Sequence, residues 1–174
     1  MLKIGITGQA GFIGKHIYNT IGLSPEKYKL IAFEKAFFES ENDLNKFVSN
    51  CDIIIHLAAM NRHNDVNVIY NNNINLVKQL ILSLERTNSR PHVIFSSSTQ
   101  EESDNLYGKS KSEGRELLIE WAKKNHAKFT GLIIPNVFGP FGKPYYNSVI
   151  ATFCHQFSHG EIPTVNGDNQ LNLI

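Results

Sequence analysis

Short apolar runs alternate along the chain with longer amphipathic stretches. The apolar runs have the length of β-strands and cover residues 2–7, 29–33, 52–57, 92–96 and 129–134. The stretches between them are predicted to be helices and cover residues 12–21, 42–50, 66–86 and 107–125. In the last two helices, apolar residues recur at three- and four-residue spacing. This alternation is typical of βαβ units and predicts a parallel sheet.

Two of the apolar runs indicate how the sheet is covered. Residues 53–55 and 132–134 consist of Ile and Leu without an intervening polar residue. Strands that are covered by helices on both faces lose the alternation of apolar and polar positions. The sequence therefore predicts an α/β fold, a doubly wound parallel sheet with helices on both faces.

Composition and charge exclude several classes of protein. The chain has 174 residues, of which 41% are hydrophobic and 19% charged, which is ordinary for one well-packed domain. The formal net charge is +1 and the basic residues are scattered, so we expect no nucleic-acid or membrane partner. No apolar run approaches the roughly 20 residues that span a bilayer, and the start lacks a secretory signal, so a cytoplasmic location is expected. Cys51 and Cys154 lack metal-ligand spacing.

A glycine-rich turn follows the first predicted strand and opens the first helix. Its sequence is TGQAGFIG at 7–14. At such a turn, free backbone N–H groups and the positive end of the helix dipole attract a pyrophosphate, and Gly8 and Gly11 leave room for its approach. Gly14 is expected to let the helix lie close to the strand, with Phe12 and Ile13 facing the core. Taken alone, the motif also fits an ordinary strand-to-helix turn.

A hydroxyl, a phenol and an amine recur further along the chain in a pattern that favours proton transfer. Tyr107 and Lys111 are four residues apart, which places them on one face of a helix. The Lys111 ammonium is expected to lower the Tyr107 pKa, so that Tyr107 exchanges a proton near neutral pH. Ser98 ends the preceding strand, where ligands of open α/β sheets bind, and is expected to hold the same substrate oxygen. An isolated Tyr and Lys at this spacing also occurs on ordinary solvated helices.

Taken together, these motifs resemble the extended short-chain dehydrogenase/reductase family, the NAD-dependent epimerases and dehydratases. The resemblance runs along the whole chain. It is carried by TGQAGFIG at 7–14, HLAA at 56–59, Asn73, SSS at 96–98, YGKSK at 107–111 and PNVFGP at 135–140.

The resemblance implies a role for each matching residue. Ser98, Tyr107 and Lys111 would act in catalysis, and Lys111 would also hold the nicotinamide ribose. Asn73 would assist a proton-relay water, and Asn136 would approach a sugar-nucleotide substrate. The cofactor-binding residues implied outside the catalytic group are Gly8, Gly11, Phe12, Ile13, Gly14, Leu57, Ala58 and Ala59.

Within the family, three features resemble reductases of capsular-polysaccharide or O-antigen synthesis. They are NRHN at 61–64, the short gap between Ser98 and Tyr107, and residues 143–156. This resemblance implies NADPH-dependent reduction of a 4-keto UDP-N-acetyl-deoxyhexose, towards UDP-N-acetyl-L-fucosamine, by a domain that precedes a cupin domain. Dehydration is disfavoured, because Thr99 and Gln100 stand where dehydratases carry an acidic residue. A nucleotide-sugar epimerase and a non-catalytic dinucleotide-binding fragment are the alternatives.

The choice between the two nicotinamide dinucleotides depends on adjacent residues, Glu34 and Lys35, near the end of the second predicted strand. An acidic residue there binds the ribose hydroxyls of NAD, whereas a basic one accommodates the phosphate of NADP. The pattern leaves both open. The resemblance favours NADP, with NAD as the alternative.

The resemblance also implies an organisation of domains and partners. Residues 1–146 are expected to form an NAD(P)-binding Rossmann domain, and residues 147–174 the beginning of a truncated substrate-binding part. A nucleotide sugar is the expected ligand, and a homodimer would form through the helix that begins near Tyr107. His155 and His159 have a spacing that suits a metal, but no third ligand accompanies them, so no metal site is expected.

Overall fold

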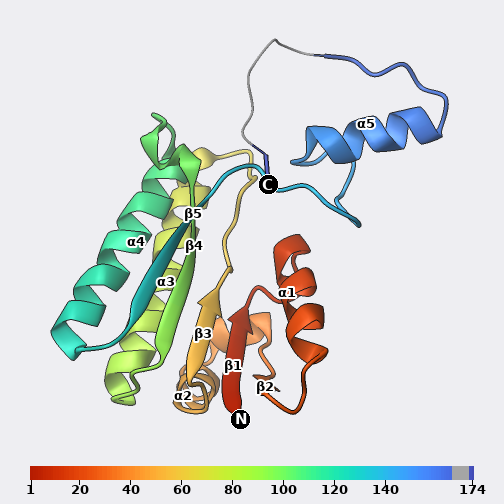
Figure 1. Cartoon of the computed structure of the whole chain (residues 1–174). Helices are drawn as coiled ribbons and strands as arrows, with labels where there is room; N and C mark the ends of the chain where they lie inside the picture. The colour runs from red at the N-terminus through yellow and green to blue at the C-terminus, as the bar shows by residue number, and fades with distance from the viewer. Residues whose placement is uncertain (166–172) are drawn as a thin grey trace. The chain divides into compact units, whose positions relative to one another are not determined.

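The computed structural model describes residues 1–165 and 173–174, and these form two compact units, residues 1–133 and 134–174. The first unit holds a parallel sheet in the strand order β2-β1-β3-β4-β5 (Figure 1). Its strands are β1 (Leu2–Thr7), β2 (Tyr28–Ile31), β3 (Ile53–His56), β4 (His92–Ser98) and β5 (Phe129–Ile134), of which the last residue opens the second unit.

The direction of the chain through the sheet reverses beside β1. From β1 the chain crosses to β2 on one side, and then returns to β3 on the other side. The β1 pairs with β2 and β3, and the pair of β3 and β4, are all parallel. The carboxyl ends of β1, β3 and β4 therefore lie at one edge, where open α/β sheets bind their ligands.

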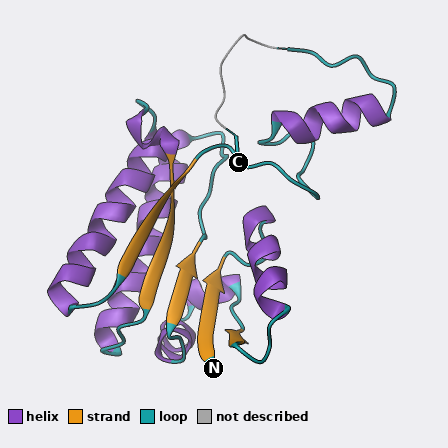
Figure 2. Cartoon of the chain, viewed as in Figure 1, coloured by secondary structure: helices purple, strands orange, loops and turns teal. Residues whose placement is uncertain are grey.

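Helices cover the sheet on both faces, as Figure 2 shows, and the predicted fold class is confirmed. The helix α3 packs against both α2 and α4 on one face. Right-handed crossovers place α1, which contacts β1 and β2, on the opposite face. The α-helices of this unit are α1 (Phe12–Gly22), α2 (Glu41–Ser49), α3 (Val66–Arg86) and α4 (Leu106–Asn125). The 3₁₀ helices η1 (Lys35–Glu39) and η2 (Thr99–Glu102) lie in segments that the hydrophobic pattern leaves unassigned.

Polar caps define where three of these helices begin. The side chains of Ser40, Asp65 and Asn105 accept hydrogen bonds from backbone N–H groups in the first turns of α2, α3 and α4. Helix α1 begins differently, because its N-cap is Gly11 and no side chain caps it. The first N–H groups of α1 are therefore not bonded by a capping side chain.

The hydrophobic core lies between the sheet and the α2, α3 and α4 layer. Helix α1 contributes little to it, since Gly14 is its buried residue. Phe12 and Ile13 are half-buried and are not among the hydrophobic residues that form or pack against this core, contrary to the expectation that they face it. The most deeply buried apolar side chains of this core include Val48, Ile54, Leu80, Leu84, Val93, Phe95 and Leu118.

The edge strand β5 departs from the predicted pattern of burial. Leu132 and Ile133 are 45% and 57% exposed, respectively, although an unbroken apolar run predicts cover on both faces. The reason is position, because β5 stands last in the strand order and has β4 as its neighbour on one side. The prediction of two-sided cover is therefore wrong for this strand among the described residues.

The second unit contains helix α5 (Val149–Ser158), which Ser148 caps through a hydrogen bond from the Ala151 N–H. Ile174 N–H donates to the Asn136 carbonyl at 3.0 Å, which joins the described end of the chain to the segment after β5. The predicted domain boundary at residues 146 and 147 stays a prediction. Within the described residues, no helix combines the length and the apolarity needed to cross a membrane.

Replacing Gly14 with Ala is expected to destabilise the first unit. A Cβ at this position would lie 2.2 Å from the Gly8 carbonyl oxygen, so the glycine turn must shift. We expect the free energy of unfolding to fall by about 2 kcal/mol in urea denaturation. Gly22→Ala is the matched control, because its Cβ would meet Leu30 at 3.9 Å and should cost nothing. Equal stability of both variants would contradict the close packing of α1.

Candidate active site

The glycine turn after β1 is tight, and two of its positions require glycine because a side chain there would collide with the backbone. Gly8 has a φ of +79°, and a Cβ there would lie 2.9 Å from the Ala58 nitrogen. Gly11 N–H donates to the Gly8 carbonyl at 3.0 Å and closes the turn. A Cβ at Gly14 would lie 2.2 Å from the oxygen of that carbonyl. Glycine at positions 8 and 14 is therefore required by close approaches of the protein's own backbone, and the role of Gly8 in admitting a pyrophosphate stays a prediction.

The segment after β3 lies against this turn. Leu57 N–H donates to the Thr7 carbonyl at 3.1 Å, and Ala58 N–H donates to Thr7 Oγ1 at 3.3 Å. These bonds fix the residues 57–59, which are predicted to contact the cofactor, beside the carboxyl end of β1. The structure thus brings two predicted cofactor segments together at one edge of the sheet.

The residues predicted to select the cofactor lie just beyond β2. This strand ends at Ile31, so Glu34 and Lys35 belong to the start of η1, with Glu34 as its N-cap. Both side chains are exposed. Gln9 of the glycine turn donates to the Phe33 carbonyl at 2.8 Å and so ties this segment to the turn. Sequence reasoning missed Gln9, because it occupies a variable position of the glycine motif.

His56 is a buried residue that the motifs do not assign to a role. Its Nδ1 lies 2.7 Å from Thr7 Oγ1, and its ring stacks on Phe95. Its Nε2 is buried without a hydrogen-bond partner. Burial, and to a smaller extent the Lys111 charge, lower the His56 pKa to about 3. His56 is therefore neutral at neutral pH and supports the ends of β1 and β3.

Three consecutive serines end β4, and each is buried with its hydroxyl bonded. Ser96 Oγ donates to the His56 carbonyl at 3.4 Å, and Ser97 Oγ donates to the Glu101 carboxylate. Ser98 Oγ accepts from Gln100 N–H at 3.2 Å and thereby caps η2. Because this hydroxyl accepts there, its own proton is left to donate to another oxygen.

Helix α4 brings Tyr107 and Lys111 to the end of β4. Lys111 is only 3% exposed, and its Nζ donates to the Ser96 carbonyl at 2.9 Å. The same nitrogen lies 5.8 Å from the centroid of the Tyr107 ring. A Cβ on Gly108 would lie 1.9 Å from the Gln100 carbonyl oxygen, so α4 begins directly against η2. The end of β4 and the predicted phenol and amine therefore belong to one compact group.

The predicted ionisation of Tyr107 is corrected by this geometry. Burial raises the Tyr107 pKa above its ordinary value, so the predicted lowering by Lys111 is wrong for this structure. The physical reason is that the Lys111 ammonium points to the Ser96 carbonyl, while the phenol is withdrawn from water. Burial also lowers the pKa of Lys111 to about 8, with Glu101 acting in the opposite direction.

Asn73 has a structural task that the resemblance does not imply. Its Oδ1 accepts from Met60 N–H at 2.7 Å, and its Nδ2 donates to the Met60 carbonyl at 3.0 Å. The same Nδ2 lies 3.1 Å from Ser110 Oγ. Asn73 thus joins the loop after β3 to α3 and α4. Its role towards a proton-relay water stays a prediction.

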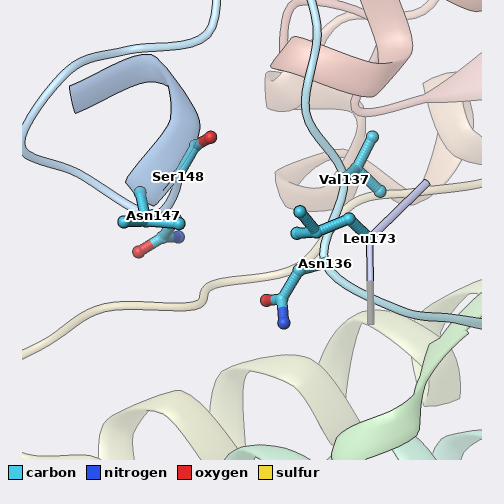
Figure 3. Close-up of a pocket in the computed structure, with 6 residues that line it drawn as sticks. Asn136, Val137, Asn147, Ser148 and Leu173 are labelled. Carbon is cyan, nitrogen blue, oxygen red and sulfur yellow. The ribbon is translucent and has the colours of Figure 1, made fainter. Parts of the chain in front are cut away.

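Asn136 belongs to the second unit, so its approach to a substrate also stays a prediction. It lines a hollow of about 170 Å³ (Figure 3), and its side chain lies beside Leu173 in that view. The hollow is lined by Asn136, Val137, Asn147, Ser148, Val149 and Leu173.

The ring centroids of His155 and His159 lie 4.0 Å apart. Within residues 1–165 and 173–174, no three His, Cys, Asp or Glu side chains gather as a metal site would require.

A parallel sheet with a glycine turn and a Ser, Tyr and Lys group at one edge is typical of dinucleotide-dependent oxidoreductases. The model of the NAD dependent epimerase/dehydratase family matches residues 4–172. The chain therefore belongs to this family, as the motifs predict.

Three known proteins are similar to the chain. It is 30% identical to a UDP-2-acetamido-2,6-beta-L-arabino-hexul-4-ose reductase of Pseudomonas aeruginosa, over 99% of this chain and 46% of the relative. It is 32% identical to the capsular polysaccharide assembling protein CapF from Staphylococcus aureus, over 99% of this chain and 45% of that one, with a TM-score of 0.78. A UDP-glucuronic acid 4-epimerase from Bacillus cereus, in complex with NAD, shares the fold. Its TM-score is 0.76 at 22% identity, over 94% of this chain and 66% of that one. The chain thus spans about half the length of the first two.

The stability of the chain is expected to fall on acidification because of His56. Its folded-state pKa of about 3 lies below the 6.5 of the free side chain, so the unfolded state binds more protons between these values. Stability from this group is present above pH 6.5 and is lost as the pH falls. Urea denaturation should show a loss of about 2 kcal/mol between pH 7 and pH 5 from this residue. His56→Gln should remove that part of the pH dependence, and an unchanged dependence would refute the assignment.

Proposed function

We propose that the chain is the cofactor-binding and catalytic part of an NADPH-dependent reductase. Its substrate would be a 4-keto UDP-N-acetyl-deoxyhexose, in the synthesis of a capsular or O-antigen sugar. The observation that carries this proposal is the Lys111 hydrogen bond to the Ser96 carbonyl, which unites Tyr107 with the end of β4. The reductase from Pseudomonas aeruginosa supports the substrate class, because its similarity extends over 99% of this chain.

The residues at the sheet edge fit a nicotinamide dinucleotide. Gly11 begins α1 without a capping side chain, so N–H groups of its first turn are left for the pyrophosphate. A side chain at Gly8 would collide with the Ala58 backbone, so glycine is required there for the turn to pack against the segment after β3. Residues 57–59 would border the adenosine, and Lys111 would hold the nicotinamide ribose. When bound, NADPH supplies a hydride.

The catalytic residues have defined tasks in such a reduction. Tyr107 donates a proton to the carbonyl oxygen of the substrate, and its raised pKa keeps the phenol protonated at neutral pH. Ser98 donates a hydrogen bond to the same oxygen and orients it, since its position is fixed by η2. Lys111 holds α4 against the end of β4 and so fixes where Tyr107 lies relative to this strand.

An epimerase is the second candidate, because the family includes enzymes of that kind. The same three residues would then oxidise and reduce one carbon of the sugar without net consumption of cofactor. The reductase is favoured, since the relative at 30% identity is a reductase, whereas the epimerase from Bacillus cereus shares the fold at 22% identity.

Replacing Tyr107 with Phe is expected to reduce turnover about 100-fold or more, because the proton donor is lost. The assay mixes the 174-residue chain, NADPH and the 4-keto UDP-sugar that the Pseudomonas aeruginosa reductase uses, and follows the fall in NADPH absorbance. Tyr18→Phe, on the outer side of α1, is the matched control and should act as the wild type. Sugar conversion without NADPH consumption would reject the reductase in favour of the epimerase.

The preference for NADPH is expected to depend on Lys35. Lys35→Ala should weaken NADPH binding about tenfold while leaving NADH binding unchanged, because the lost ammonium contacts the phosphate. Titration of nicotinamide fluorescence measures both affinities. Lys29→Ala, which removes the same charge from an exposed position near the amino end of β2, should change neither. Tighter binding of NADH than of NADPH by the wild type would indicate instead that the cofactor is NAD and that Glu34 binds its ribose hydroxyls.

A further inference from the structure

Glu101 is an almost buried carboxylate that the motifs and the proposed mechanism do not use. Its side chain is 8% exposed, compared with 28% for its partner Arg115. Arg115 binds it with two nitrogens, Nε at 2.9 Å from Oε1 and Nη2 at 2.7 Å from Oε2. Ser97 Oγ donates to Oε1 as well. Such paired, charge-assisted bonds fix the geometry of a carboxylate more firmly than a surface ion pair does.

The elements that Glu101 joins are those that carry the proposed catalytic residues. Glu101 lies on η2, the short helix that begins directly after Ser98. Arg115 lies on α4, one helical turn after Lys111. Ser98 Oγ is positioned by the Gln100 N–H of the same η2 turn. A shift of η2 along α4 would therefore move Ser98 relative to Tyr107.

The negative charge of Glu101 also acts on the buried Lys111. Ser97, which binds the carboxylate, follows Ser96, whose carbonyl accepts from Lys111 Nζ. Among the described residues, the titratable groups that act on or lie near Lys111 are Glu101 from η2, His56 from β3 and Tyr107 from its own helix. His56 is neutral at neutral pH, and so is Tyr107. The Glu101 carboxylate therefore opposes the effect of burial on the Lys111 pKa.

We infer that Glu101 is a positioning residue of the proposed active site, which fixes η2, and with it Ser98, to α4 through Arg115. The inference rests on the proposed function, since it assigns Ser98 and Lys111 their tasks. It predicts more than a loss of stability, because Glu101 and Arg115 form one ion pair but carry opposite charges.

The test compares Glu101→Gln with Arg115→Gln in the full 174-residue chain. Both variants break the same ion pair, so a purely structural role would affect Lys111 equally in both. We expect Glu101→Gln to lower the Lys111 pKa by about one unit, and Arg115→Gln to raise it, because the unpaired carboxylate remains. NMR titration of ¹⁵N-labelled lysine side chains measures this pKa, and the signal is assigned by its absence in Lys111→Arg.

NADPH titration by fluorescence adds a second readout. Glu101→Gln should bind NADPH about tenfold more weakly than Glu102→Gln, the matched control that removes the same charge from the exposed neighbouring residue. Shifts of the Lys111 pKa in the same direction in both variants, or no shift in either, would overturn the inference. If Glu101→Gln does not fold, an unchanged Lys111 pKa in Arg115→Gln would also overturn it.

The same measurements separate this inference from the proposed function. Opposite shifts of the Lys111 pKa in a chain that does not bind NADPH would uphold the electrostatic role of Glu101 and reject the proposed function. Tight NADPH binding that is equal in the wild type and Glu101→Gln, together with an unshifted Lys111 pKa in both variants, would uphold the cofactor site and reject the role of Glu101.

Discussion

The hydrogen bond from Lys111 to the Ser96 carbonyl is the interaction on which the candidate site depends. An ammonium that is 3% exposed must find partners inside the protein, and this bond supplies one at 2.9 Å. It holds α4 against the end of β4 and so brings Tyr107 close to this end of the strand. The Glu101 carboxylate opposes, in part, the effect of burial on the Lys111 pKa. Lys111, the Ser96 carbonyl and Glu101 therefore determine both the position of α4 and the charge at this site.

The glycine turn imposes a second constraint, which is steric. Gly8 meets the Ala58 backbone, and Gly14 meets the Gly8 carbonyl, at distances that no side chain tolerates. Together these contacts bring the ends of β1 and β3 and the start of α1 close to one another. Because α1 begins without a side-chain cap, the compact turn presents backbone donors at the edge of the sheet. These features explain why a dinucleotide suits this edge.

Most of the fold follows from the periodicity of apolar residues, because βαβ units bury their strands and one face of each helix. The bounds of β1, α3 and β5 agree with the sequence prediction to the residue. The periodicity did not predict the exposure of β5, the half-burial of Phe12 or the η2 turn that carries Glu101. These features depend on the position of a strand in the sheet and on contacts between side chains. The ionisation of Tyr107 was mispredicted, since spacing along a helix does not reveal which partner an ammonium contacts or how deeply a phenol is buried.

The most direct test of the central claim is to map NADPH binding residue by residue from the backbone amide NMR signals of the chain. The account predicts that saturating NADPH shifts the signals of residues 8–14 and 57–59 most strongly, together with Lys111. Signals at the opposite end of the sheet, such as those of Lys29 and Asp52, should stay in place. Binding that leaves the glycine turn unperturbed, or the absence of binding by the folded chain, would contradict a dinucleotide site at the carboxyl edge of the sheet.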